Sequence, residues 1–501
     1  MSYYLILDVG TTNIKAIAFS EGKPVLEISE KPRVHCPMEG WVEEDPEEVI
    51  EIVKKLIDRV IEKLGKPLGI GITNQRSSTV VWDKEDGSPL YKIITWQDTR
   101  TKEIVEQYSS EFIVRFGYAL GKFLSGISRL LPFIKHTKKG AYIITLAYVS
   151  FGTTHSSMHL KWLMDNIEGV KNAMNCNKLA FGTLDSWVAW SLVKKHVTDY
   201  TNASATGLFD PFYLKWSENI TKIVGISKNI LPYLIENDRI VGNVNDYDAP
   251  LLSIIADQQA SLYAAGVSSG TMKITHGTGS FVDLNVGEKP YPGNIGLYPL
   301  VALVTRRKSL YMLEGSVITS GSAIDWLLEV GLMKEYSEID EAFKVTEKSS
   351  LVVIPALSGL GTPYVKPEIK GAIFEITRAT KRTDIIKGLV EGIAMRCAEI
   401  VEHIEGSSGI FTKEIIVDGG FSRSNAFLQT LADLSGKVIV RPRYLNGSAY
   451  GAYMLSKLVK EGKDVIENWK PQEVDKKFIP AKDMADFRRK WKEKINLLLR
   501  I

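Results

Sequence analysis

Two glycine turns in this chain each lie between two short apolar runs of the kind that form strands. The first turn, Gly10-Thr11-Thr12-Asn13, separates residues 3–7 from 14–19, and the second, Gly277-Thr278-Gly279, lies within 272–285. A turn of this composition is typical of a β-hairpin, and its backbone N–H groups can form a concave surface that suits phosphate oxygens. The repetition predicts that two related halves hold one phosphate-bearing ligand from two sides.

Side chains at the first turn extend this prediction, because Thr11, Thr12 and Lys15 can add donors for a phosphate. Neither turn has the G-x-x-x-x-G-K-[ST] pattern of a P-loop, and neither continues as the G-x-G-x-x-G of a dinucleotide fold. An ordinary hairpin remains the alternative for either turn alone, but two copies in one chain favour nucleotide binding by another architecture.

The length of 501 residues favours two domains, and the net charge of +3 gives no electrostatic reason to propose nucleic acid or an anionic membrane as partner. A small-molecule substrate is therefore expected. Cys36, Cys176 and Cys397 are far apart and form no CxxC pair, which fits a reducing cytoplasm. We expect no secretion signal and no transmembrane segment, because the apolar stretch 141–152 is too short to cross a bilayer.

The order of predicted elements is that of an α/β domain with a mixed sheet, and it occurs twice. The first half has two strands joined by the hairpin turn, then a helix that starts at Asp45-Pro46 and ends at Gly65, and a buried strand at 68–73. The second half has the hairpin 272–285 followed by strands at 308–314 and 414–417 and helices at 322–330, 383–404 and 425–434. The segment 266–270, Gly-Val-Ser-Ser-Gly, predicts a joint between domains 1–265 and 266–501.

The stretch Tyr108–Phe151 cannot be placed from its pattern, since it is apolar but carries Arg115, Lys122 and Arg129 and is interrupted by a basic segment at 135–140. We expect an altered core of the first domain here, with a subunit contact as the alternative. The sequence leaves the oligomeric state open, and a homodimer or a homotetramer is compatible with it.

Two carboxylates follow apolar strand-like runs and precede polar residues, namely Asp8 and Asp257. The carboxyl edge of an open α/β sheet is where ligands bind, so the pair predicts a general base and a Mg²⁺-orienting group. A helix cap is the alternative for either one. The clusters 74–76, Asn-Gln-Arg, and 96–98, Trp-Gln-Asp, could hold a hydroxylated substrate, with surface ion pairing and core packing as their alternatives.

Other chemistries find little support. His155 and His159 are four residues apart, but no acidic third ligand is close to them in the sequence, so a zinc site is not supported. The serine hydrolase pattern G-x-S-x-G occurs only at residues 266–270, the segment that predicts the joint between the domains, so serine hydrolysis is a poor hypothesis.

A series of motifs in order along the chain resembles the FGGY carbohydrate kinases, and within them the glycerol kinases. The resemblance runs from Leu5 to Ala452 and rests on residues 8–12, 41–46, 71–76, 197–204, 257–260, 276–279, 358–364 and 418–420. It implies two ribonuclease-H-like domains of the type found in actin and hexokinase, with ATP and substrate in the cleft between them.

The resemblance also implies roles for single residues. Asp257 would accept the proton of the attacking hydroxyl, and Asp8 would help to place Mg²⁺. Phosphate-binding positions are Gly10, Thr11, Thr12, Asn13, Lys15, Gly277 and Thr278. Gly321, Gly420 and Asn425 would line the adenosine pocket. The polyol would be held by Gln75, Arg76, Trp96, Gln258 and Phe281, together with Asp257.

Several positions depart from the family pattern. Ser77 stands where glycerol kinases carry a glutamate, His159 replaces a lysine, and Thr154 is the nearest counterpart of a substrate-binding tyrosine. Residues 97–161 form a longer segment than the family pattern has, and Glu375 and Gly388 are exceptions in a second signature. We therefore expect an ATP-dependent kinase for glycerol, with a pentulose or other sugar as the alternative acceptor. An actin-like ATPase or binding module without transfer activity is the hypothesis from a second class.

Overall fold

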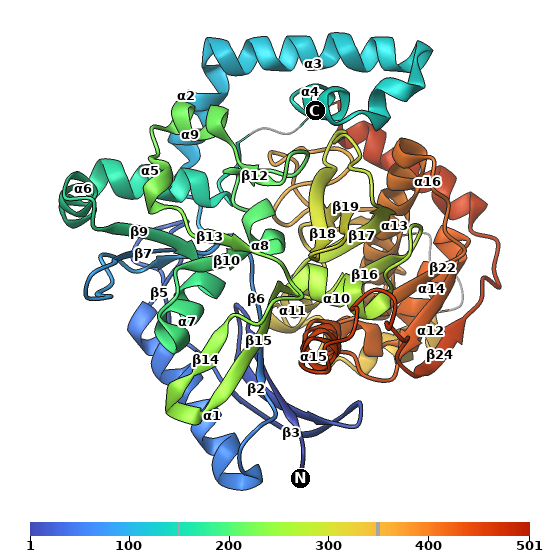
Figure 1. The fold of residues 1–501 in the computed structure, drawn as a ribbon. Helices are drawn as coiled ribbons and strands as arrows, with labels where there is room; N and C mark the ends of the chain where they lie inside the picture. The colour runs from blue at the N-terminus through green and yellow to red at the C-terminus, as the bar shows by residue number, and fades with distance from the viewer. Residues whose placement is uncertain (149–150, 347–350, 501) are drawn as a thin grey trace.

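The computed structural model describes residues 1–148, 151–346 and 351–500. Two large mixed β-sheets dominate it, one built from the first half of the chain and one from the second (Figure 1). Each sheet has one of the two predicted glycine hairpins near its centre.

The first sheet has the strand order β14-β15-β6-β1-β2-β3. Strand β1 pairs antiparallel with β2 and parallel with β6, and β15 runs parallel to β6. The bounds are β1 Tyr4–Val9, β2 Ile14–Ser20, β3 Lys23–Glu30, β6 Ile70–Asn74, β14 Gly242–Val244 and β15 Ala249–Ala256.

The second sheet has the order β18-β19-β17-β16-β22-β23-β24. Strand β16 pairs antiparallel with β17 and parallel with β22, which runs parallel to β23. The bounds are β16 Met272–His276, β17 Ser280–Gly287, β18 Tyr298–Val304, β19 Ser309–Val317, β22 Glu414–Asp418, β23 Val438–Pro442 and β24 Val474–Phe478.

The central strands of the two sheets correspond one to one. The order β3-β2-β1-β6-β15 matches β19-β17-β16-β22-β23, with antiparallel pairs on one side and parallel pairs on the other. This confirms the predicted duplicated α/β fold of ribonuclease-H type. The predicted boundary between residues 265 and 266 lies between the two sets of strands, and it stays a prediction.

Helix α1, Pro46–Leu64, illustrates how the sequence specifies an element. The Asp45 side chain accepts hydrogen bonds from the N–H groups of Glu47 and Glu48, Pro46 occupies the first turn, and Gly65 ends the helix at φ +76°. Its apolar stripe, which includes Val53 and Leu56, is buried against the first sheet. The predicted helix is confirmed at both ends.

A smaller sheet and a group of helices cover the first half. The sheet has the order β4-β5-β8-β7-β9, with bounds Val34–His35, Glu43–Glu44, Ile93–Ile94, Thr79–Asp83 and Leu179–Thr183. The helices are α5 Ser156–Asn166, α6 Glu168–Asn175, α7 Leu184–Val193, α8 Tyr200–Ser204 and α9 Glu218–Val224. Short strands β10 Val197–Asp199 and β13 Tyr233–Ile235 pair, as do β11 Phe209–Asp210 and β12 Lys215–Trp216.

The second half is covered by its own helices. They are α11 Gly321–Glu329, α12 Glu338–Val345, α13 Arg382–Ser408, α14 Asn425–Ser435 and α16 Ala485–Leu498, and a short sheet pairs β20 Val352–Ile354 with β21 Ala372–Phe374. The predicted helices at 322–330, 383–404 and 425–434 are confirmed within a few residues at each end.

Two helices, α10 Asp257–Ala265 and α15 Gly447–Lys460, pack together between the sheets. A Cβ atom added at Gly451 would lie 1.9 Å from the carbonyl oxygen of Ala260, so only glycine permits this approach. The hydrophobic cluster around them includes Phe19 of the first half and Met312 and Tyr453 of the second. The two halves therefore share a core.

The unplaced stretch forms a helical projection that we call the 102–145 hairpin. It consists of α2 Lys102–Ser110, α3 Phe112–Leu130, the 3-10 helix η1 Pro132–His136 and α4 Lys138–Thr145. Helix α3 lies along the edge of the molecule in Figure 1 and leaves Phe112 and Leu130 more than 80% exposed. The expectation of an altered domain core is thus wrong for α3; residues 149–150 lie outside the described part. Among the described residues, no helix is long and apolar enough to cross a membrane.

Candidate active site

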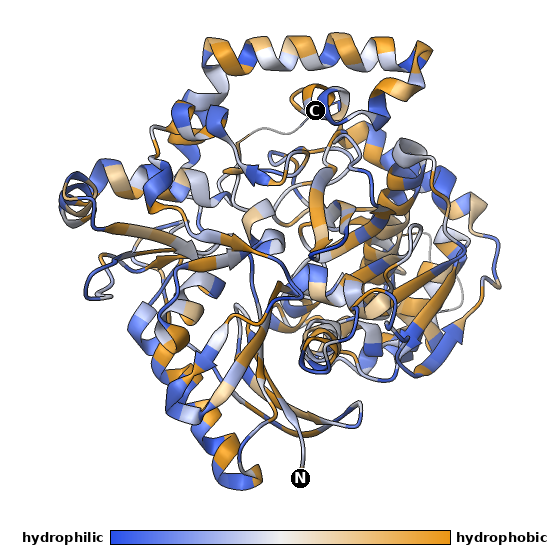
Figure 2. Cartoon of the chain, viewed as in Figure 1, coloured by the Kyte–Doolittle hydropathy of each residue, from blue (hydrophilic) through white to orange (hydrophobic). Residues whose placement is uncertain are grey.

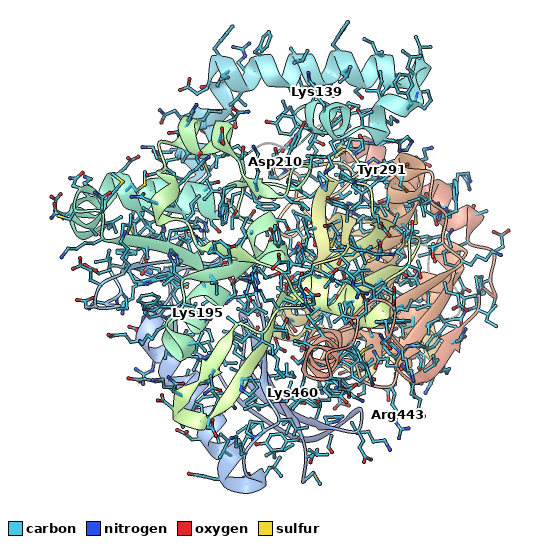
Figure 3. The ribbon with its side chains drawn as sticks, in the orientation of Figure 1. Lys139, Lys195, Asp210, Tyr291, Arg443 and Lys460 are labelled. Atoms are coloured by element: carbon cyan, nitrogen blue, oxygen red, sulfur yellow. The ribbon has the colours of Figure 1, made fainter. Side chains whose placement is uncertain are left out.

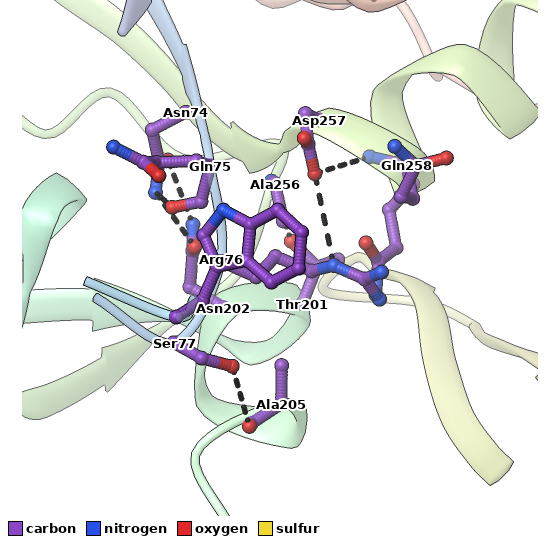
Figure 4. A network of polar contacts seen from close by, with 12 residues as sticks. Asn74, Gln75, Arg76, Ser77, Thr201, Asn202, Ala205, Ala256, Asp257 and Gln258 are labelled. Carbon is purple, nitrogen blue, oxygen red and sulfur yellow. Dashed lines mark hydrogen bonds and ion pairs between the residues drawn. The ribbon is translucent and has the colours of Figure 1, made fainter. Parts of the chain in front are cut away.

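Asp257 lies where strand β15 ends and helix α10 begins, as the sequence predicted (Figure 4). Its Oδ1 accepts a hydrogen bond of 2.7 Å from the backbone N–H of Gln258 and lies 3.6 Å from Nε of Arg76. Burial raises the pKa of Asp257, while the positive charge of Arg76 opposes the rise. The carboxylate is thus held in a site that favours accepting a proton more than an exposed aspartate would.

A buried polar network supports the strand ends on which Asp257 and Arg76 stand. Asn74 and Asn202 exchange side-chain hydrogen bonds of 2.9 and 3.1 Å, and Asn202 also donates to Asp199. The hydroxyl of Thr201 accepts the N–H of Ala256, the residue before Asp257, at 2.9 Å (Figure 4). Because every member is paired, the network fixes the backbone beneath the site.

Arg76 connects the first half of the chain with the second. Its Nη2 lies 2.8 Å from Oε2 of Glu314 on β19, and its guanidinium carbon lies 5.7 Å from the ring centroid of Phe281 on β17. The Arg76 side chain is 11% exposed. Residues predicted to act together from distant parts of the sequence therefore meet at one place between the two sheets.

A buried lysine that sequence reasoning missed holds Gln258. Lys273 on β16 donates to Oε1 of Gln258 at 2.5 Å and to the hydroxyl of Thr275 at 2.7 Å, and it pairs with Asp283 at 2.6 Å. Lys273 is 1% exposed. A lysine within the apolar run 272–276 was the available signal, since a buried charge requires a partner.

Asp8 is the penultimate residue of strand β1 and contacts the second half through Asn446, whose Nδ2 donates to its Oδ2 at 2.9 Å. Burial raises the pKa of Asp8 to about 6, against the effects of Asn446 and Lys15, and Asp257 contributes to the rise. Leu445, next to Asn446, accepts the N–H of Gly419 at 2.9 Å. The first turn and the end of β22 are therefore neighbours.

Gly419 in turn lies against the strand that leads into the second turn. A Cβ atom added at Gly419 would lie 2.3 Å from the carbonyl oxygen of His276, the residue before Gly277. The buried Asp418 accepts a hydrogen bond of 2.5 Å from Ser261 on α10, and its Oδ1 has no hydrogen-bond partner. The carboxyl ends of β1, β15, β16 and β22 thus converge on one region.

Both glycine turns present backbone donors that the described part of the protein does not use. The N–H groups of Thr11, Thr12 and Asn13, and those of Thr278 and Gly279, have no hydrogen-bond partner among the described residues. Such groups form the concave donor surface that anions occupy.

Lys15, by contrast, already has a partner, because its Nζ pairs with Oε1 of Glu27 at 3.2 Å.

The hydroxyl of Thr11 bridges two residues predicted to bind the acceptor. It donates to Oε1 of Gln75 at 2.7 Å and accepts the indole N–H of Trp96 at 2.9 Å. The Nε2 atom of Gln75 is buried without a hydrogen-bond partner.

The residues predicted to line an adenosine pocket begin or adjoin helices. Gly321, the first residue of α11, donates its N–H to the carbonyl of Gly277 at 3.1 Å, which joins this helix to the second turn. A Cβ atom there would lie 2.4 Å from the same oxygen. Asn425 begins α14, and Gly420 lies in the preceding 3-10 helix; both are exposed.

The positions that depart from the family pattern differ in their surroundings. Ser77 adopts φ +65° and donates to the carbonyl of Ala205 at 2.9 Å (Figure 4). His159 is fully buried between Thr79 and the carbonyl of Thr153, and burial lowers its pKa to about 4. Thr154 is exposed.

The predicted polar cluster around Trp96 is divided in two. Asp98 accepts the N–H of Val42 and pairs with Arg100 at 2.7 Å, and Arg100 lies 3.8 Å from the ring centroid of Trp41. Asp98 is buried. Asp98 was grouped with Trp96 because the two are close in the chain. The partners of Asp98 show instead that it stabilises the segment around residues 41–46.

The two halves share one topology, and the carboxyl ends of their strands converge near the ion-paired Asp257. This arrangement is that of a two-domain α/β kinase fold. The chain belongs to the FGGY family of carbohydrate kinases. The family's N-terminal domain model matches residues 3–123 and 133–258, and its C-terminal domain model matches residues 272–457.

Relatives support this assignment over nearly the whole length. An uncharacterized sugar kinase of Archaeoglobus fulgidus is 37% identical over 98% of both chains. A glycerol kinase of Caldanaerobacter subterraneus is 35% identical over 96% of this chain and 94% of its own. The crystal structure of Plasmodium falciparum glycerol kinase with ADP is 28% identical, with a TM-score of 0.87 over 100% of this chain and 98% of its own. The protein is thus an ATP-dependent carbohydrate kinase acting on a small molecule.

Proposed function

We propose that this kinase transfers the γ-phosphoryl group of ATP to a terminal hydroxyl of glycerol, which gives sn-glycerol 3-phosphate. The observation that carries the proposal is the placement of Arg76 against Asp257, Glu314 and Phe281 at the junction of the two halves. Relatives named glycerol kinase over almost the entire chain favour this acceptor.

Asp257 accepts the proton of the attacking hydroxyl while oxygen attacks phosphorus. Burial raises its pKa, which makes it a better proton acceptor than an exposed aspartate, while the positive charge of Arg76 opposes the rise. Arg76, Gln75 and Gln258 hold the acceptor hydroxyls, and Trp96 and Phe281 pack against its C–H faces. Because Oε1 of Gln258 is used by Lys273, its NH₂ group is the part left for a substrate oxygen.

The nucleotide lies across the two glycine turns. Gly10, Thr11, Thr12 and Asn13 bind phosphate oxygens from the first half, with Lys15 close by, and Gly277 and Thr278 bind from the second. Gly321, Gly420 and Asn425 line the adenosine pocket. The unpaired N–H groups of both turns support this arrangement, since a phosphoryl-transfer enzyme acts mainly by positioning and charge neutralisation.

The acidic residues fit a Mg²⁺ ion that is bound jointly with the phosphates of ATP. No group of three His, Cys, Asp or Glu side chains suited to a metal occurs among the described residues. Mg²⁺ in kinases commonly uses one or two carboxylates plus substrate phosphates, and Asp8, with Asp257 nearby, supplies these. When bound, the ion neutralises charge on the phosphates.

A pentulose or another sugar is the second candidate for the acceptor, and Ser77 is the observation that favours it. Glycerol kinases carry a glutamate at this position, whereas Ser77 here donates its hydroxyl to Ala205. A neutral hydroxyl is a weaker acceptor than a carboxylate. A purely ATP-hydrolysing or binding function is the third candidate.

Turnover of purified protein with ATP and a panel of polyols and ketoses distinguishes these candidates. We expect glycerol to be the best acceptor. Robust turnover of a pentulose without turnover of glycerol would select the second candidate, and acceptor-independent ATP hydrolysis would select the third.

The variant Asp257→Asn tests the proton acceptor directly. Transfer should fall by about 10² to 10⁴, while ATP binding measured by calorimetry stays close to that of the unmodified protein. Asp248→Asn, which removes an exposed carboxylate that pairs with Lys66, serves as the matched control and should keep full activity. Near-normal transfer by Asp257→Asn would remove the assignment.

A further inference from the structure

The outer side of helix α3 is an apolar surface on which the described part of the chain places nothing. Phe112, Phe116, Leu120, Phe123 and Leu130 are 82, 59, 40, 66 and 84% exposed. Their spacing of three, four and seven residues puts them on one face of the helix. We call these five residues the α3 outer face. In Figure 2 hydrophobic residues recur along the whole length of this helix.

The opposite side of α3 packs on α4 within the hairpin, so the direction of the outer face is fixed. Gly121 and Ser128 are buried, and a Cβ atom at Gly121 would lie 2.6 Å from the carbonyl oxygen of Ile143. Residues 121 and 128 lie about half a turn around the helix from Phe116 and Phe123. The apolar side chains therefore point away from the protein. Packing in the core of this protein does not explain why apolar residues occupy these positions.

A row of cations runs along the side of the outer face. Arg115, Lys122 and Arg129 are seven residues apart, so they fall on one line along the helix. Lys122 lies 4.6 Å from the ring centroid of Tyr148, just after α4, which places the row on the flank of α3 between the outer face and the body of the protein. Lys135, Lys138 and Lys139 continue the positive charge, and Lys139 is labelled beside α3 in Figure 3.

No Asp or Glu occurs from Phe112 to Met164, and the acidic residues of the 102–145 hairpin, Glu103, Glu106 and Glu111, all precede α3. The net charge of +3 for the whole chain hides this local concentration. An aromatic and aliphatic face beside a row of Lys and Arg is the pattern of a helix that lies in the surface of an anionic membrane. Two copies pairing through α3 would instead bring cations together without acidic partners.

We propose that the 102–145 hairpin docks this kinase on anionic lipid bilayers. Helix α3 lies in the plane of the headgroups with its outer face among the acyl chains, and Arg115, Lys122 and Arg129 contact lipid phosphates. The helix does not span the bilayer. This inference does not depend on which acceptor the kinase uses.

Flotation of the full-length protein with vesicles tests the proposal. We expect it to float with phosphatidylglycerol vesicles and to remain unbound with phosphatidylcholine vesicles, and added salt should weaken the binding. Replacement of three cations in Arg115→Gln/Lys122→Gln/Arg129→Gln should weaken it about 100-fold, since each contributes about a factor of five at an anionic surface.

The double variant Phe116→Ser/Phe123→Ser removes the apolar contribution and should weaken binding by at least about tenfold. Phe411→Ser is the matched control, because Phe411 is 74% exposed but lies in the loop between α13 and β22. All three variants should keep the kinase activity measured without vesicles, which shows that they fold.

Equal flotation with both kinds of vesicle, or unchanged flotation of the α3 variants, would overturn the proposal. A loss of self-association in Phe116→Ser/Phe123→Ser, measured by analytical ultracentrifugation, together with no vesicle binding by the unmodified protein would also overturn it and identify a second copy as the occupant.

Discussion

At the scale of single residues, Glu314 influences Asp257, the proposed proton acceptor, in two ways. Its negative charge raises the pKa of Asp257. Its ion pair with Arg76 also partly neutralises the guanidinium charge that lowers the pKa of Asp257. Glu314→Gln removes the negative charge and frees the guanidinium of Arg76 from its ion pair. Both changes lower the pKa of Asp257. Because the base must be deprotonated to work, the acid limb of the kcat/KM profile should move to lower pH.

The measurement is the pH dependence of kcat/KM for the acceptor in both proteins. The opposite substitution provides the control, since Arg76→Met removes a positive neighbour and should move the same limb to higher pH. A limb that stays in place in both variants would show that another group controls the profile.

A second prediction at this scale concerns Lys273, whose contribution to the stability of the fold can be measured separately from its effect on substrate binding. Lys273→Met leaves Asp283 buried without a counter-charge and should lower the free energy of unfolding by about 3 to 5 kcal/mol. The double variant Lys273→Met/Asp283→Leu removes both charges and should recover most of this loss. Denaturant unfolding measures both.

The double variant should still bind the acceptor poorly, because Gln258 has lost the donor that orients its amide. We expect its KM to rise about tenfold, a typical effect of one hydrogen bond to a charged group. An unchanged KM in a stable double variant would assign Lys273 to the fold alone.

At the scale of elements, the contact between α10 and α15 depends on one glycine. Gly451→Ala places a methyl group 1.9 Å from the carbonyl of Ala260, so the helices must separate. Overpacking of this kind destabilises by about 1 to 3 kcal/mol, and activity should fall as well, because Asn446 at the start of α15 contacts Asp8.

Gly406 in α13 is the matched control, since a Cβ atom there meets nothing within 4 Å. Gly406→Ala should raise stability by about 0.5 to 1 kcal/mol, the usual gain for alanine over glycine inside a helix. Thermal unfolding of both variants checks the contrast. Equal effects of the two substitutions would contradict the packing argument.

Elements with strong local signals could be predicted from the sequence. Helix α1 carries its own cap and stop signals, and the hairpins around Gly10 and Gly277 are specified by turn composition and apolar runs. The roles of Lys273 and Asp98 could not be predicted, because their partners are set by tertiary contacts. Helix α3 was missed because an apolar sequence normally indicates a core, and here the apolar face is exposed.

At the scale of the whole molecule, the shared core joins the two halves into one folding unit. Phe19 stacks on Tyr453 with ring centroids 4.7 Å apart, and the cluster around them draws on both sheets. We expect calorimetry and near-UV circular dichroism to report a single unfolding transition. Fragments 1–265 and 266–501 expressed separately should aggregate, since each would expose this apolar surface.

Phe19→Ala extends the test, because it should lower the melting temperature of that one transition without dividing it. Two resolved transitions in the unmodified protein, or a soluble and folded fragment, would show that the halves are thermodynamically independent.

The bridging hydroxyl of Thr11 has a consequence for how the two substrates influence each other. It belongs to the turn that we propose to bind the triphosphate, and it also hydrogen-bonds Gln75 and Trp96. On this proposal, we expect an adjustment of the turn on nucleotide binding to be transmitted to the residues proposed to hold the alcohol. Linkage then requires reciprocity: whatever factor ATP applies to the affinity for the alcohol, the alcohol applies to the affinity for ATP. In Thr11→Val that mutual dependence should weaken, and the two dissociation constants should approach independence.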